Sequence, residues 1–160
     1  MKAVLISIQP YWVFLIIAKI MGWNIDKEKT VEVRKSYPKA ENWNKVAKIY
    51  CSKDKRSFSK IPKEYQPLME RFLGKVIGEF ICDEIADCRD LTLTPTCLTL
   101  EQWLKYTDNH KGPVWGWHIS DLVIYDQPKP LSKFAVERYP CMALLKRPPQ
   151  SWFYVEEVQE

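Results

Sequence analysis

The sequence lacks most of the signatures that assign a biochemical function directly. No Cys-x-x-Cys pair occurs, and the spacing of the five cysteines matches no zinc-binding pattern. There is no nucleophile elbow, no recognisable catalytic triad, no internal repeat and no low-complexity tract. We therefore expect no structural zinc, no repeat architecture and no triad-type hydrolase, and we predict neither a bound metal nor a cofactor.

Apolar runs long enough to span a bilayer are also absent. The two runs near the N-terminus cover residues 3–8 and 11–21, and both are shorter than the roughly 20 residues that a spanning helix needs. Gln9-Pro10 ends the first run, Lys19 interrupts the second, and no small-residue cleavage site follows. We interpret both as buried elements rather than as an export signal or an anchor. The odd number of cysteines fits reduced thiols, so we expect a cytoplasmic protein.

Neither sign of charge is in large excess. A net charge of +4 permits contact with nucleic acid without demanding it, because dedicated duplex binders carry denser basic clusters. The densest basic stretch, residues 52–63, is either a solvated surface segment or a flexible arm that contacts phosphates. Seven tryptophans and eight tyrosines suit the core of a β-rich domain, although some could stack on bases or sugars.

Hydrophobic patterning predicts one domain over residues 1–160, built from short strands and a few helices. Between residues 115 and 125 we expect either a strand pair or one bent strand, and Gly78 indicates a bulge or the close approach of another group. Without a strand–helix–strand rhythm, the class is α+β, a small mixed β-barrel with two to three flanking helices. Strands are expected over 2–9, 29–35, 45–51, 75–83, 115–125 and 151–155, helices over 11–21, 65–73 and 100–106, and turns or loops over 52–63, 127–130 and 139–147.

The strand over residues 29–35 has the most informative pattern. The strand period of two places Val31 and Val33 on one face, which can pack on a core. The opposite face combines an acid, a guanidinium and a hydroxyl, a set that suits a polar ligand. The alternative is a surface ion pair between Glu32 and Arg34, worth at most about 1 kcal/mol. The polar side chains of this face and of the strand's ends are Lys29, Thr30, Glu32, Arg34 and Lys35.

Two further groups of residues are candidates for ligand contact. On a strand, His118 and Ser120 share one face and Trp117 lies on the other; His118 could donate to a phosphate or a base, act as a general base, or simply bond a neighbour. Pro148-Pro149 preset the position of Gln150 and Ser151. A glutamine amide donates and accepts together, which suits a base edge or neighbouring backbone groups equally.

Several of these motifs, in their order along nearly the whole chain, resemble the ASCH family, a branch of the PUA-like superfamily. Its signature is Gly-x-Lys-x-x-Glu-x-Arg, which Lys29, Glu32 and Arg34 match, whereas Lys27 stands at the glycine position. The similarity is greatest to ASCH-like proteins of phages and bacterial mobile elements. The matching segments are the opening strand and helix, KTVEVR (29–34), GKVIGEF (74–80), WHISDL (117–122) and PPQSW (148–152).

The resemblance implies a β-barrel with a cleft beside the first helix, where members bind RNA, nucleotides or modified nucleosides. Lys29 and Arg34 would pair with phosphate, and Glu32 would accept from a base edge or hold Arg34 in place. Some relatives are amidohydrolases of acylated nucleosides or ribonucleases, which would make Lys29 and Glu32 acid–base catalysts. Because Glu32 stands where the amidohydrolases keep a threonine, binding is favoured over catalysis.

Three functions follow as hypotheses. The first is a module that binds RNA or a nucleotide-like ligand through the residues above. The second is a small hydrolase that uses Lys29 and Glu32. The third is a protein-interaction effector or homodimer, suggested by the uniformly apolar helix over residues 11–21, because exposed apolar surface marks interfaces.

Overall fold

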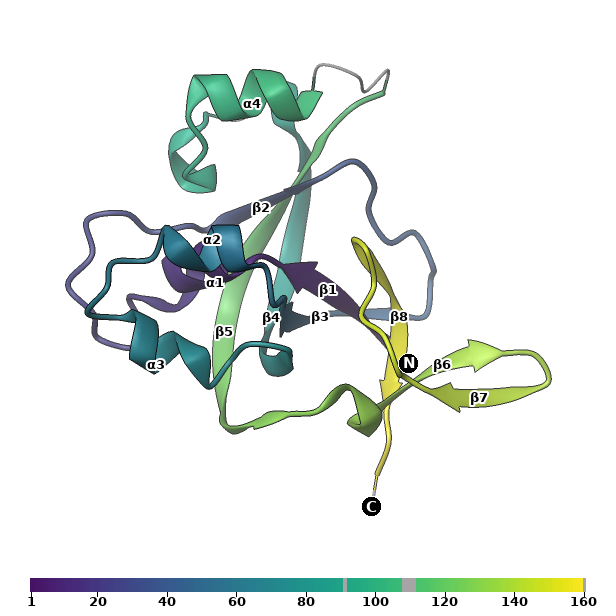
Figure 1. Ribbon diagram of the computed structural model, residues 1–160. Coiled ribbons are helices and arrows are strands. Elements are labelled where there is room, and N and C mark those ends of the chain that lie inside the picture. Colours follow the sequence, from purple (N-terminus) through teal and green to yellow (C-terminus); the bar gives the residue numbers. More distant parts are fainter. Residues whose placement is uncertain (91, 108–111, 160) are drawn as a thin grey trace.

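The computed structural model describes residues 1–90, 92–107 and 112–159 (Figure 1). Within these residues one curved sheet carries helices along one side and a projecting hairpin at its far end. No described helix is both long and apolar enough to cross a membrane. The strands are β1 (Lys2–Ile8), β2 (Val31–Arg34), β3 (Trp43–Cys51), β4 (Lys75–Asp87), β5 (Trp115–Lys129), β6 (Phe134–Arg138), β7 (Cys141–Leu144) and β8 (Trp152–Glu157).

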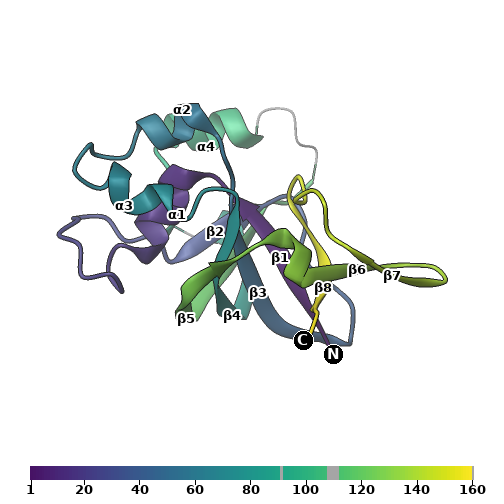
Figure 2. The same ribbon diagram turned by 60° about the horizontal axis from the view of Figure 1, so that its bottom comes forward.

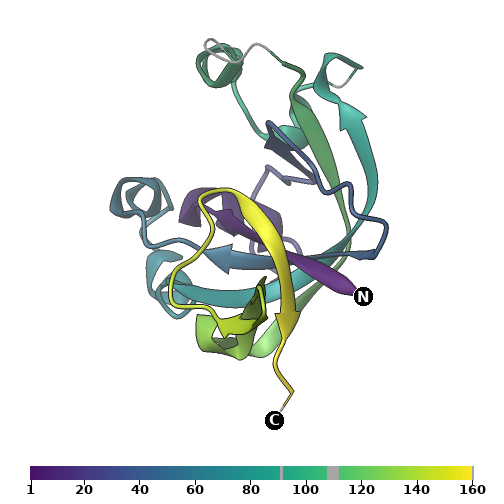
Figure 3. The ribbon, with the colours of Figure 1, turned by 90° about the vertical axis from the view of Figure 1, so that its right-hand side faces the viewer.

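The strands form one sheet in the order β2-β5-β4-β3-β1-β8-β6-β7. Only the β1–β3 pair is parallel among the described pairs; the others are antiparallel. Figure 3 shows the long strands β4 and β5 curving around the side of the sheet on which α1 (Pro10–Ile17) lies. The predicted α+β class with flanking helices is confirmed. The sheet is not closed into a barrel by backbone pairing, since β2 and β7 remain its two edges.

The helices gather mainly on the concave side of the sheet, while the β6–β7 hairpin projects away from them (Figure 2). Two five-residue helices also lie on this side, and an eight-residue helix packs over β2. Besides α1, the structure has α2 (Lys55–Ser59), α3 (Gln66–Glu70), α4 (Leu100–Thr107) and the 3₁₀ turns η1 (Cys88–Asp90), η2 (Thr94–Thr96) and η3 (Leu131–Lys133).

The apolar character of α1 reflects burial within its own chain. Val13 and Phe14 are buried in the main core, together with the interior faces of β1, β3 and β4. Pro10 occupies the first turn, as predicted. The regular helix ends at Ile17, four residues before the predicted end, although Gly22 does adopt the expected positive φ of 73°. Because the helix is covered on both sides, it offers no broad apolar face to a partner.

Three segments predicted as loops contain regular structure. Residues 52–63 hold α2, whose N-terminus is capped by Asp54 accepting from the Ser57 amide at 2.7 Å. Ser57 Oγ in turn accepts from the Tyr11 amide at 3.0 Å, which fixes α2 against α1. Residues 127–129 continue β5, and residues 139–147 contain β7. These predictions were wrong because a five-residue helix is too short to show a period, and β7 carries exposed apolar side chains that do not alternate with polar ones.

A polar cluster around the buried Lys48 stabilises the sheet on the side away from α1. The ammonium of Lys48, in β3, lies 3.1 Å from Glu79 Oε1 and 3.0 Å from Glu157 Oε2. Tyr125 donates to Glu79 at 2.7 Å. Burial tends to raise the pKa of the Glu79 carboxyl, but the hydrogen bonds from Tyr125 and Lys48 outweigh it and lower that pKa. The cluster therefore links four strands, β3, β4, β5 and β8, by charge-assisted hydrogen bonds.

Gly78 allows the backbones of β4 and β5 to approach closely. A β-carbon at this position would lie 2.2 Å from the Val123 carbonyl oxygen and 3.1 Å from Ile124 Cα. The pairing of β4 with β5 shifts register beside it, between Val76 and Gly78. The predicted bulge and close approach are both confirmed.

We expect Gly78→Ala to lower the free energy of unfolding by about 2–3 kcal/mol, because the backbone of β5 must move to admit a methyl group. Denaturant unfolding followed by circular dichroism measures the change. Gly22→Ala is the control: it has φ 73° but no atom within 4 Å, so only backbone strain of about 1 kcal/mol applies. An equal or smaller loss for Gly78→Ala would contradict the close approach.

Candidate functional site

Both faces of β2 are buried. The sequence suggested that the valine face would pack on the core, but it is the face with Glu32 that turns toward the main core. Val33 lies in a small satellite cluster with Cys88 and Val114, against which residues of α4 pack. The face that carries Glu32 looks toward the main core, because Glu32 stands opposite the fully buried Trp117 in the β2–β5 register. The polar face therefore points into the curve of the sheet, where charged groups need partners.

Lys29 is buried under the first helix. Its side chain lies before the first residue of β2, so it escapes the strand alternation and turns toward Glu32, with 3.9 Å between Nζ and Oε2. The ammonium donates to the Thr96 carbonyl at 2.7 Å and lies 5.1 Å from the centre of the Trp12 ring. Only 3% of Lys29 is exposed. Burial lowers the pKa of this ammonium, and the nearby Glu32 carboxylate only partly offsets the effect.

Glu32 lies between two cations and has one unused oxygen. Its Oε1 accepts from the Val33 amide at 3.2 Å and lies 3.5 Å from Arg34 Nε. Its Oε2 is buried and has no hydrogen-bond partner, although Lys29 is close enough for an ion pair. Only 6% of the residue is exposed. An unpaired buried carboxylate oxygen is costly, so Oε2 is an unused hydrogen-bond acceptor in the interior.

Arg34 connects the β2 edge to the centre of the sheet. Its Nη2 donates to the Ser7 carbonyl at 2.7 Å, and its Nη1 donates to Ser151 Oγ at 3.2 Å and to the Ser151 carbonyl at 3.4 Å. The Ser7 amide also donates to the Ser151 carbonyl, at 2.9 Å. The guanidinium thus joins the end of β1, the residue before β8 and Glu32 at one point.

Tryptophans line the same interior. The Trp117 and Trp152 rings meet edge to face with centroids 5.9 Å apart. The Trp117 indole donates to the Ser36 carbonyl at 3.3 Å, and the Trp152 indole donates to Ser36 Oγ at 3.0 Å. These two indoles therefore link the segment after β2 to β5 and β8 by hydrogen bonds, next to the bonds that Arg34 makes.

Some sequence-predicted residues lie at the margin of this Lys29–Glu32–Arg34 cluster. Thr30 uses its backbone, donating to the Pro95 carbonyl at 2.9 Å and accepting from the Ile119 amide at 2.8 Å. Lys35 is exposed, with its ammonium 4.9 Å from the centre of the Tyr106 ring. Gln150 is exposed beside Ser151. Of the predicted set, the structure brings Lys29, Glu32, Arg34, Trp117 and Ser151 together.

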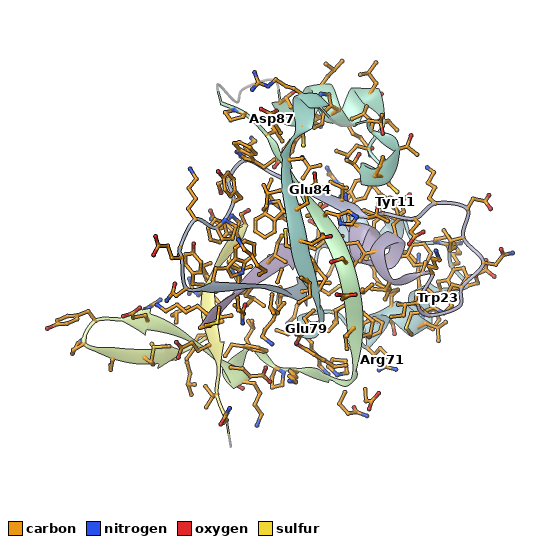
Figure 4. All side chains as sticks on the ribbon, turned by 180° about the vertical axis from the view of Figure 1, so that it is seen from behind. Tyr11, Trp23, Arg71, Glu79, Glu84 and Asp87 are labelled. Carbon is orange, nitrogen blue, oxygen red and sulfur yellow. The ribbon has the colours of Figure 1, made fainter. Side chains whose placement is uncertain are left out.

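His118 and Ser120 are not brought to the cluster. His118 stands opposite Val31 in the β2–β5 register, so its side chain is on the face away from Glu32. Its Nδ1 lies 2.6 Å from Asp83 Oδ1, and 42% of the side chain is exposed. Ser120 Oγ donates to the Ile81 carbonyl at 2.8 Å. Figure 4 looks onto this outer face of β4, along which Glu79, Glu84 and Asp87 are spaced.

Sequence reasoning missed the residues that complete the cluster. Trp12, Ser7 and Thr96 come from three distant segments, and two of them contribute only a main-chain carbonyl, which any residue supplies. No sequence signal could have identified those carbonyls. In the described residues, no group of three or more His, Cys, Asp or Glu side chains is arranged to hold a metal ion.

Fold and site together define a small α+β domain whose curved sheet encloses a Lys–Glu–Arg cluster. No protein-family model matches the sequence, and no curated protein sequence is significantly similar to it. Among solved structures, ASCH from Zymomonas mobilis is similar at 19% identity and a TM-score of 0.51, covering 97% of this chain and 88% of that one. A point mutant of ZmASCH gives 16% identity and a TM-score of 0.53, over 98% and 91%. The chain has an ASCH-like fold.

Burial of Lys29 makes stability depend on pH. The unfolded chain keeps the Lys29 proton up to its ordinary pKa of 10.5, while the folded protein releases it at lower pH. Between these two values the unfolded state binds more protons at Lys29, so the contribution of Lys29 to the free energy of unfolding rises with pH, by about 1.4 kcal/mol for each unit of lowering. We expect Lys29→Met to lose this contribution, as measured by denaturant unfolding at a series of alkaline pH values up to 10.5.

Lys27→Met, at an exposed lysine of the same loop, is the matched control and should follow the parent protein. The thiols of Cys51 and Cys82, whose pKa values burial raises to about 12, oppose the rise equally in all three proteins. Parallel pH profiles for the parent and Lys29→Met would contradict a lowered pKa.

Proposed function

We propose that this protein binds RNA or a nucleotide-like ligand at the Lys29–Glu32–Arg34 cluster. The observation that carries the proposal is the orphaned Glu32 Oε2, held in place by Arg34 and the Val33 amide yet bonded to no donor. A ligand N–H or O–H placed there would remove the desolvation cost of an unpaired carboxylate oxygen.

The charges of the cluster indicate the ligand class. Two cations and one carboxylate leave one net positive charge when Lys29 is protonated, which suits a group with a single negative charge beside a hydrogen-bond donor. A nucleotide offers this combination, since its base or ribose donates and its phosphate is anionic. Arg34 is already engaged by Ser7 and Ser151, so its main role is to position Glu32. Trp12, half-buried beside Lys29, supplies an aromatic surface.

Hydrolysis of an acylated nucleoside or of RNA is the second candidate, supported by the lowered pKa of Lys29. A buried lysine whose pKa is lowered gives up its proton more readily, as a base or a nucleophile requires. Among the described residues, however, no serine or threonine hydroxyl hydrogen-bonds to Lys29 Nζ, so no activated nucleophile pair is formed. Binding is therefore the primary proposal.

We expect Glu32→Gln to weaken binding of nucleoside monophosphates and RNA oligonucleotides by about 10- to 100-fold, the value of a charge-assisted hydrogen bond. Tryptophan fluorescence and calorimetric titration at low salt measure the affinity, and mass spectrometry of the ligand that copurifies identifies the natural one. Glu28→Gln, at an exposed carboxylate, should bind as the parent does. Saturable binding that is unchanged in Glu32→Gln would refute the assignment.

If the protein is a hydrolase, Lys29→Met should reduce turnover of acylated nucleosides or RNA by at least about 100-fold, as loss of a general base does. Product formation followed by chromatography measures it, with Lys27→Met as the control. Activity that survives in Lys29→Met and in Glu32→Gln would sink the catalytic assignment of both residues.

A further inference from the structure

A cavity lies away from the Lys29–Glu32–Arg34 cluster, between the β6–β7 hairpin and β8. It has a volume of about 930 Å³, and both apolar and basic side chains line it. We call it the hairpin groove and define it by the side chains that the argument uses: Arg138, Met142, Leu144, Lys146, Arg147 and Phe153.

The groove is positively charged. Four basic and two acidic residues line it, which gives a net charge of +2. One of the two acids, Glu137, is already paired with Lys2. Across the described part of the chain, no acidic side chain forms an ion pair with Arg138, Lys146 or Arg147. These cations are therefore available to an anionic partner.

The hairpin that forms the groove also presents an aromatic ring to solvent. Tyr139, at the turn between β6 and β7, is 98% exposed, and none of the ring contacts among the described residues involves it. The hairpin projects from the body of the molecule in Figures 1 and 2. A basic groove with an accessible aromatic ring is the arrangement that binds single-stranded nucleic acid, because phosphates contact the cations and a base stacks on the ring.

The groove and the cluster are joined by a short segment. Only three residues lie between Arg147 and Ser151, whose hydroxyl and carbonyl accept from Arg34, so the two lie within about 14 Å of extended chain. A strand with one nucleotide at the cluster can therefore run past Arg147 and Lys146 toward Tyr139. A single bound nucleotide could not reach both.

We propose that the hairpin groove binds the backbone of a single-stranded nucleic acid whose one nucleotide occupies the Lys29–Glu32–Arg34 cluster. The inference rests on the proposed function and extends it: the ligand is a strand rather than a free nucleotide. Lys146 and Arg147 contact phosphates, and Tyr139 stacks on a base farther along the strand.

The test compares two adjacent Lys–Arg pairs that carry the same charge. Lys146→Ala/Arg147→Ala removes the pair in the groove, and Lys55→Ala/Arg56→Ala removes an equally exposed pair on α2. Fluorescence anisotropy with a labelled RNA of about 12 nucleotides gives the affinity at several salt concentrations. We expect the groove variant to bind about tenfold more weakly and to lower the slope of log affinity against log salt by about 1.4. The α2 variant should match the parent.

Tyr139 provides an independent arm of the test. Tyr139→Ala should weaken RNA binding by at least about fivefold, while Tyr139→Phe keeps the stacking surface and should bind as the parent does. Thermal unfolding checks that each variant is folded. Affinity for a nucleoside monophosphate, which reaches only the cluster, should be unchanged in all groove and hairpin variants.

The outcomes separate this inference from the proposed function. Parent-like RNA binding by the groove variant, or equal losses in both Lys–Arg variants, would overturn the groove while the Glu32-dependent nucleotide site stands. RNA binding that needs the groove but not Glu32, without mononucleotide binding, would support the groove and refute the proposed function. A dimer in sedimentation that the groove variant abolishes, with RNA affinity unchanged, would assign the surface to a second copy and overturn the inference.

Discussion

The Arg34 guanidinium is the constraint on which this architecture depends. Three strands separate β2 from β1 in the open sheet, yet Arg34 reaches from β2 to the Ser7 carbonyl and to Ser151. Backbone pairing closes a barrel by a continuous ladder, whereas here side chains perform the closure, with the two indoles that donate to Ser36 alongside. The Lys29–Glu32–Arg34 cluster lies at this side-chain closure, between β2 and the paired strands β1 and β8.

The same closure explains how a glutamate can be buried without a full set of partners. Arg34 and Lys29 stabilise the Glu32 carboxylate by charge, so the desolvation penalty is offset even though Oε2 accepts no hydrogen bond. The Lys48 cluster contrasts with it. There, Glu79 and Glu157 each accept hydrogen bonds, the carboxylates are partly exposed, and the arrangement is satisfied without a ligand. The Lys48 cluster is therefore satisfied within the protein, whereas the Lys29–Glu32–Arg34 cluster keeps one unused hydrogen-bond acceptor.

Much of the fold was predictable because strong local patterns agree with it. The capping box at Thr99 is present, with Gln102 donating to and accepting from it, and Gly78 marks a real backbone approach. The hairpin at residues 134–144 was not predictable, since its strand β7 carries exposed apolar side chains in no clear period. At the site, the Lys–Glu–Arg spacing identified three members. The alternation rule then excludes His118 from that face, once the pairing of Val31 with His118 is known.

The sequence by itself determined which residues carry charge on β2, the α+β class and the buried nature of the first helix, because each depends on local composition and period. Only the tertiary structure decided that the polar face of β2 turns inward, that Ser7 and Thr96 supply carbonyls to it, and that the hairpin forms a basic groove near Ser151. Those outcomes depend on strand order and register. Register is set by long-range packing, and main-chain carbonyls have no sequence identity to reveal them.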